Sequence, residues 1–142
     1  MRGAMSHAMA HEAKSWMKRE PRYRWLGEVS HGKALRLLAR SRLMVISSRM
    51  EGGANVVSEA LVNGVPVIAS RISGNIGLLG RDYAGYYPLE DEATLARLLW
   101  RTETDRAFYL KLVQQCRARK SLVTHASERG ALQRVLSGAL MR

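Results

Sequence analysis

Two glutamates, Glu51 and Glu59, lie eight positions apart around a glycine pair, Gly52 and Gly53, in the segment EGGANVVSE. Glycines let the backbone approach a ligand closely, and the free N–H groups at a helix start, with the helix dipole, form an anion site suited to phosphate. Carboxylates accept hydrogen bonds from hydroxyl pairs but repel phosphate. The segment therefore predicts a ligand that has a phosphate part and a hydroxyl-bearing part.

The helix expected from Ala54 sets the distance between these two parts. Its apolar positions share an inward face: Val56, Val57, Ala60 and Leu61. Its polar positions share the outer face: Asn55, Ser58 and Glu59. At about 1.5 Å rise per residue, Glu59 lies roughly 7 to 8 Å from Ala54, about the separation of a pyrophosphate from its ribose. A pyrophosphate at the glycines would leave Glu59 near ribose hydroxyls and Glu51 near a sugar on the other side.

Alternating strands and helices are expected to position this segment. Strands are expected at 42–47, which has a continuous apolar centre, and at 65–69, and such runs are typical of strands covered on both faces of a parallel sheet. Shorter strands at 23–26 and 85–88 bring the total to about four. Helices are expected at 10–20, from Ser30 for about three turns, and at 54–64, 91–102, 104–119 and 126–141. This order predicts an α/β fold with a Rossmann-like parallel sheet and a helical C-terminus, and with fewer strands than a complete six-stranded Rossmann domain.

Length and composition exclude several classes of protein. The chain has 142 residues, 46% of them hydrophobic, which fits one folded domain and argues against a disordered basic tail. No apolar stretch approaches the roughly 18 to 20 residues that span a bilayer. The opening MRGAMSHAMA lacks the long apolar core of a signal peptide, so we expect a cytoplasmic protein without a membrane span.

The formal net charge of +11 is unevenly distributed along the chain. Residues 1–50 and 101–142 carry +8 and +6, whereas residues 51–100, which contain the glutamates, carry −3. A nucleic-acid binder is expected to place a basic stripe on its recognition element, so nucleic acid is a disfavoured partner.

Several other polar residues have two interpretations. Arg49 and Arg71 flank the expected site and would either neutralise phosphate or pair with Asp82 or Glu51. Three tryptophans are expected in the core or an interface rather than as stacking platforms: Trp16, Trp25 and Trp100. His31 is expected to be exposed at a helix start, and Cys116 to be a buried helical residue without a disulfide partner. His7 and His11 have helical metal spacing but lack a third ligand, so no metal is expected.

The segment EGGANVVSE, followed by ALVNGVPVIAS, resembles the E-x7-E donor-binding motif of the retaining GT-B glycosyltransferases. The resemblance runs from about Arg22 to Leu89, because RYRWLGEVSHGKALRLLARSRLMVISS matches the strand–Gly–helix–strand lead-in of that family. It implies a C-terminal donor-binding domain that transfers a hexose from a nucleoside diphosphate sugar, such as a UDP-sugar, without a further cofactor. The sequence SRMEGGANVVSEA…GNIGLLG is similar to that of the selenosugar synthases of selenoneine assembly, which join a nucleotide sugar to a selenium nucleophile.

The resemblance also implies a role for each matching residue. Glu51, the catalytic candidate, would contact the transferred sugar, and Glu59 would bind the nucleotide ribose. The other donor-binding positions are Gly27, near the base, and Ser48, Gly52, Gly53, Ala54 and Asn55, in and after the turn beside the diphosphate. Two features depart from the family: a glutamate is frequent where Gly77 stands, and nothing upstream of residue 20 matches the Arg and Lys that bind the donor phosphates.

These observations divide the chain into an N-terminal helical segment, residues 1–21, and an incomplete donor-binding domain, residues 22–142. The acceptor domain would lie outside this chain, so we expect it to be inactive alone. An uncovered sheet edge near 23–26 predicts self-association. The alternative is a non-catalytic binding module, either a nucleotide-sugar sensor or a basic nucleic-acid-binding domain. The sequence leaves the sugar, the base and the acceptor open.

Overall fold

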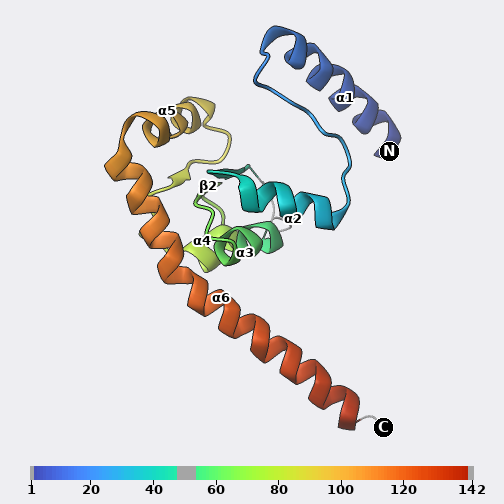
Figure 1. The fold of residues 1–142 in the computed structure, drawn as a ribbon, viewed down its shortest axis with the longest axis vertical. Helices are drawn as coiled ribbons and strands as arrows, with labels where there is room; N and C mark the ends of the chain where they lie inside the picture. Colours follow the sequence, from blue (N-terminus) through green and yellow to red (C-terminus); the bar gives the residue numbers. More distant parts are fainter. Residues whose placement is uncertain (1, 48–53, 141–142) are drawn as a thin grey trace. The chain divides into compact units, whose positions relative to one another are not determined.

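A parallel sheet follows the first two helices of the chain (Figure 1). The computed structural model describes residues 2–47 and 54–140. The chain divides into two units, Met1–Ala34 and Leu35–Arg142. In the second unit, strands β1 (Met44–Ile46), β2 (Val67–Ser70) and β3 (Tyr86–Tyr87) lie side by side in the order β1-β2-β3. Both strand pairs are parallel, with Val45 opposite Ile68 and Ala69 opposite Tyr86.

Helices connect the strands in the alternation that the sequence predicts. Helix α3 (Ala54–Val62) lies between β1 and β2, and α4 (Ser73–Leu79) lies between β2 and β3. Helices α5 (Glu92–Thr104) and α6 (Arg106–Leu140) follow β3, and α6 packs against α3, α4 and α5 (Figure 1). The α/β class, with a Rossmann-like parallel sheet and a helical C-terminus, is therefore confirmed.

The hydrophobic core of the second unit is built on β2, all four residues of which are buried. Three large side chains with no exposed surface come from different elements: Leu61 of α3, Ile68 of β2 and Leu112 of α6. Burying each of these stabilises the fold by roughly 1.5–3 kcal/mol. The central strand is covered on both faces, which explains why its sequence is a continuous apolar run.

Gly64 ends α3 and starts the turn into β2. Its φ of 72° is a left-handed conformation that glycine adopts without steric cost. The amide of Gly64 donates to the Leu61 carbonyl (3.2 Å), and the amide of Val65 donates to the Ala60 carbonyl (2.9 Å). These two bonds form a Schellman cap, and they confirm the prediction that glycine closes this helix.

The first unit consists of α1 (Arg2–Arg19) and the segment that leads to α2 (His31–Arg40). The helix expected at 10–20 is confirmed and begins earlier than predicted. The strand expected at 23–26 is wrong, since these residues pair with no strand among the described residues. A strand needs a ladder of partners, and the described residues contain three strands rather than about four.

Two further predictions are wrong, one about where a helix ends and one about packing. The helices expected at 104–119 and 126–141 form one continuous α6, because no proline interrupts the chain between them and polar residues cost a helix less than about 1 kcal/mol each. Val56, expected on the inward face of α3, is 39% exposed. Trp16 and Trp100 are exposed, so neither lies in the core, and the alternative of an interface stays a prediction.

Candidate functional site

The carboxyl ends of the three strands mark the candidate site. Ser47, Arg71 and Pro88 come directly after β1, β2 and β3, and because the strands are parallel these ends meet at one edge. Helices α3, α4 and α5 follow the same three strands, so they start at this edge too. In open α/β sheets this is where ligands bind, with helix N-termini directed toward the ligand.

A cavity of about 670 Å³ opens at this edge. Its described walls come from the ends of β1 and β3 and the start of α5, and they consist of Ser47, Tyr87, Leu89, Glu90, Glu92 and Leu95. The volume falls in the usual range for small-molecule sites. Two carboxylates and two hydroxyls on these walls suit a ligand that carries hydroxyl groups.

Tyr87 joins the two outer strands at this cavity. Its ring is buried, and its hydroxyl donates to the Ile46 carbonyl of β1 at 3.2 Å, although β2 lies between the two strands. Burial raises the pKa of Tyr87, and a hydrogen bond from Ser47 opposes the shift. The phenol therefore stays protonated and can donate to the Ile46 carbonyl. Because Ser47 directly follows Ile46, this bond also sets the distance between Ser47 and the end of β3.

Glu90 enters the cavity from a left-handed backbone conformation. Its φ is 67°, and no other non-glycine residue of the described chain has a positive φ. Such a conformation costs a residue with a side chain of order 1 kcal/mol, and residues of this kind cluster at functional sites. Asp91 follows and caps α5, accepting hydrogen bonds from the Thr94 amide (3.0 Å) and hydroxyl (2.7 Å). These bonds hold the pKa of Asp91 below its usual value.

The end of β2 is held by Asn75, which lies in α4 and is buried. Its side-chain amide donates to the Ser70 carbonyl at 2.8 Å. A buried polar side chain is stable only when it is hydrogen-bonded, and this bond fixes the turn between β2 and α4. The segment SGNIGLLG, which forms α4 and its C-terminal Gly80, thus has a structural role at the strand end.

Arg71 lies at the centre of the edge and is exposed. Its guanidinium carbon is 5.3 Å from the centre of the Tyr86 ring, and its Nη1 donates to the Arg81 carbonyl at 3.5 Å. Arg71 forms no ion pair with Asp82 in the described part of the chain, so that interpretation is not supported. Burial raises the pKa of Tyr86 to about 12, although the charge of Arg71 acts in the opposite direction.

Glu59 lies on α3, where it is half-buried and already interacts with a neighbouring group. Ala54 and Asn55 form the first turn of this helix. Five of the predicted site residues fall outside the described residues: Ser48, Arg49, Glu51, Gly52 and Gly53. Helix α3 begins at Ala54, as the sequence predicts, and it follows β1 in the chain.

The remaining residues singled out in the sequence belong to other elements of the chain. Gly27 belongs to the first unit and has a φ of 64°, which favours glycine. Cys116 is a buried residue of α6 and His31 is exposed at the start of α2, so both predictions are confirmed. The described residues hold no group of three or more metal-ligating side chains, and none of their helices is both long and apolar enough to span a membrane.

Tyr87, Glu90 and Glu92 line the cavity at the carboxyl edge, and none of them is predicted as a site residue from the sequence. A signal was present, because the polar run EDE begins two residues after the expected strand at 85–88 and polar residues at the carboxyl ends of parallel strands are placed to meet ligands. The backbone conformation of Glu90 had no such signal, since glutamate is not a residue that favours positive φ.

A Rossmann-like sheet with a cavity at its carboxyl edge defines a ligand-binding α/β domain. The family model of glycosyl transferases group 1 matches residues 10–119. This match covers more than half of the 142 residues, and the chain belongs to this glycosyltransferase family. None of the curated proteins compared with the chain matches it.

Proposed function

We propose that this chain is the donor-binding domain of a hexosyltransferase and that the carboxyl edge of its sheet holds a nucleoside diphosphate sugar. The observation that carries the proposal is the position of α3, which follows β1 at this edge and presents Glu59 on its partly exposed side. Glu59 lies five residues beyond Ala54, or about 7.5 Å along the helix. This separation fits a diphosphate at the helix start and a ribose at Glu59.

The charges of the edge support this division of the ligand. Amide groups at the start of α3 and the exposed guanidinium of Arg71 favour the diphosphate. Arg49 is proposed as a second cation at the same phosphates. The hydroxyl-bearing parts of the donor are assigned to carboxylates, namely the ribose to Glu59 and the transferred sugar to Glu51.

The chemical step follows from this arrangement. The bond between the anomeric carbon and the diphosphate oxygen breaks, and its electron pair stays on the diphosphate. A new bond forms between the anomeric carbon and the acceptor, which loses a proton. Amides and cations that already face the diphosphate stabilise the negative charge that develops on it, and such preorganised groups supply a large part of enzymatic rate enhancement. We propose that another domain supplies the acceptor, and that configuration is retained.

The donor site is tested by calorimetric titration of the chain with UDP and UDP-glucose. Glu59→Gln should weaken binding by about tenfold or more, since a hydrogen bond to a charged group contributes roughly 1.5–3 kcal/mol. Glu103→Gln is the matched control, because Glu103 is an exposed glutamate at the end of α5 that lies away from the cavity. This variant should bind UDP and UDP-glucose with the affinity of the wild type.

Two results would overturn the proposal. One is donor affinity that is equal in Glu59→Gln and the wild type. The other is tight binding of duplex DNA that falls steeply between two salt concentrations and does not depend on Glu59, which would identify the nucleic-acid-binding module instead.

The class of acceptor is proposed from the amino-acid sequence around the predicted donor site. The similarity of SRMEGGANVVSEA…GNIGLLG to selenosugar synthases favours a selenium nucleophile. Mass spectrometry of a reaction that contains the complete enzyme, a UDP-sugar and hydrogen selenide should show a sugar product with the isotope pattern of selenium. A product formed only with hydroxyl acceptors would exclude this subgroup.

A further inference from the structure

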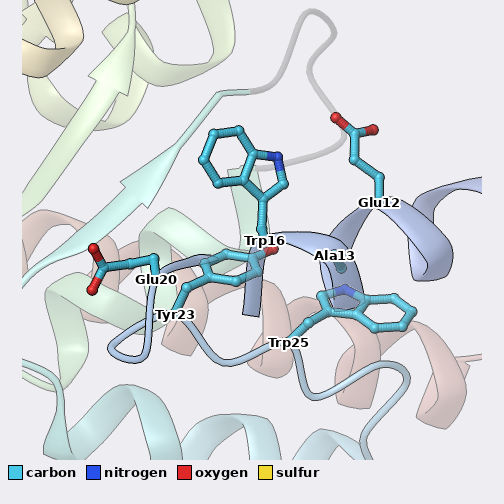
Figure 2. Close-up of a pocket in the computed structure, with 6 residues that line it drawn as sticks. All are labelled: Glu12, Ala13, Trp16, Glu20, Tyr23 and Trp25. Carbon is cyan, nitrogen blue, oxygen red and sulfur yellow. The ribbon is translucent and has the colours of Figure 1, made fainter. Parts of the chain in front are cut away.

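We propose that the first unit carries a separate carbohydrate site, which binds one neutral pyranose ring. A cavity of about 470 Å³ lies within this unit, and its walls are Glu12, Ala13, Trp16, Glu20, Tyr23 and Trp25 (Figure 2). All six residues belong to α1 or to the segment that directly follows it. The proposal concerns a different ligand from the nucleotide of the donor site and does not depend on that site.

The cavity forms because the chain folds back along α1 after residue 20. The Glu20 amide donates to the Trp16 carbonyl (2.9 Å), and the Tyr23 amide donates to the Glu20 carbonyl (3.0 Å), which makes a tight turn. The Trp25 amide then donates to the Met17 sulfur at 3.4 Å. This return places the Trp25 ring near Ala13, whose exposed fraction is only 5%.

Aromatic rings form most of the apolar wall. Trp16 and Tyr23 remain 50% and 41% exposed, so a ligand can contact both rings, and the Arg19 guanidinium lies over one face of Trp16. Figure 2 shows the three rings around the turn, with Glu12 and Glu20 on opposite sides of Trp16. A pyranose ring with equatorial hydroxyls has two flat faces of C–H groups, and aromatic side chains offer large apolar faces to pack against them.

The carboxylates are spaced to reach the hydroxyls of such a ring. Glu12, Trp16 and Glu20 follow one another at four-residue intervals, so they lie along one face, about 6 Å apart at 1.5 Å per residue. A ring stacked on Trp16 would therefore have a carboxylate beyond each end. Sugar hydroxyls donate to such carboxylates, which hold several acceptor positions each.

Glu20 is kept ionised by its neighbour Arg22. Arg22 donates to its carboxylate from Nε at 2.8 Å and from its backbone amide at 3.1 Å, and these bonds lower the pKa of Glu20. Nη2 of the same guanidinium donates to the other carboxylate oxygen of Glu20 at 3.4 Å. The carboxylate of Glu20 therefore stays charged and is an acceptor for a sugar hydroxyl.

The charge around the cavity favours a neutral ligand over an ionic one. Five basic residues surround the two glutamates in this part of the sequence: Lys14, Lys18, Arg19, Arg22 and Arg24. The guanidinium of Arg19 lies 5.6 Å from the Trp16 ring centre and adds to this positive surrounding, which disfavours a cationic ligand. An anion would face the carboxylates of the wall, whereas a neutral sugar meets neither obstacle.

The test uses the complete chain with ¹⁵N-labelled tryptophan and methyl β-cellobioside as the probe. Indole N–H signals of Trp16 and Trp25 should move on titration, and that of Trp100 should not. Trp16→Ala should weaken binding by about tenfold or more. Trp100→Ala is the matched control, because Trp100 is a similarly exposed tryptophan in the second unit, and it should bind like the wild type.

Glu12→Gln serves as the second variant, since it changes one charge on an exposed helix position and leaves the rings in place. It should weaken binding severalfold while the indole spectrum of the free protein stays unchanged. No movement of the Trp16 signal at probe concentrations on the order of 10 mM would overturn the proposal. So would tighter binding of choline than of the glycoside, or equal loss in Trp16→Ala and Trp100→Ala. Measuring the affinity for UDP in the same samples distinguishes a failure of the carbohydrate site from a failure of the donor site.

Discussion

Tyr83 shows how single atoms connect the sheet to the long helix. Its buried hydroxyl donates to the Val67 carbonyl, accepts from the Val67 amide at 3.3 Å, and lies 3.2 Å from the Cys116 sulfur. Burial raises the pKa of both Tyr83 and Cys116. The thiol therefore stays neutral, and a neutral, buried thiol is a poor nucleophile. Cys116 contributes to packing rather than to chemistry.

The Tyr83 ring leaves room for no side chain at position 85. A Cβ on Gly85 would lie 2.6 Å from both the Val67 carbonyl oxygen and the Tyr83 ring. We expect Gly85→Ala to lower the free energy of unfolding by about 1–3 kcal/mol, the usual effect of overpacking. Urea denaturation followed by circular dichroism measures the change.

Gly77→Ala is the control for this substitution. Gly77 lies inside α4, and a Cβ there would meet nothing within 4 Å. Alanine favours a helix over glycine by up to about 1 kcal/mol, so this variant should be as stable as the wild type or more so. Equal urea midpoints for Gly85→Ala and Gly77→Ala would contradict the packing at Gly85.

At the scale of elements, α5 depends on one carboxylate at its start. Asp91 caps the helix through Thr94, and its pKa is lower in the folded chain than in the unfolded one. A lowered pKa means that the stabilisation is present above the unfolded value of about 3.8 and is lost as pH falls through the folded value. The cap should therefore weaken only under strongly acidic conditions.

We expect Asp91→Ala to be less stable than the wild type near pH 7, and this difference to shrink near pH 3. Urea midpoints at the two pH values test this. Asp91→Asn retains an acceptor oxygen but does not titrate, so it should lose less stability than the wild type over the same pH range. A stability difference between Asp91→Ala and the wild type that is independent of pH would show that the charge of Asp91 contributes nothing to the cap.

The elements that the sequence predicted best are those with strong local signals. The apolar run of β2, the amphipathic α3 and the glycine at position 64 each specify their structure within a few residues. The strand expected at 23–26 failed because strand formation depends on partners that local sequence does not show. For the site, the glycines and glutamates predict a ligand at the β1–α3 connection, which stays a prediction, whereas the Tyr87 contact with Ile46 joins residues 41 positions apart and has no local signal.

At the scale of the whole molecule, nearly all of the buried apolar surface belongs to the second unit. The core cluster extends from Val57 to Cys116, and Ala13 is the one buried side chain in residues 10–34. Because burial of apolar surface dominates folding, the stability of the sheet should not depend on the first unit.

A shortened chain, residues 30–142, should therefore unfold within about 1 kcal/mol of the complete chain in urea. It begins at Ser30, whose hydroxyl accepts from the Lys33 amide at 3.2 Å and so retains the start of α2. The same deletion removes all six residues of the proposed carbohydrate site and should abolish glycoside binding. A shortened chain that is unfolded in buffer would contradict the independence of the second unit.

The hydrogen bond from Tyr87 to Ile46 has a consequence for how this sequence can vary. It links β1 to β3 without using β2, so it shares the task of holding β1 with the ladder that β1 and β2 form. Substitutions that weaken this ladder at Val45 or Ile68 should be tolerated while the tyrosine is present and become severe in Tyr87→Phe. The hydroxyl of Tyr87 should therefore determine which substitutions at Val45 and Ile68 the protein tolerates as its sequence diverges.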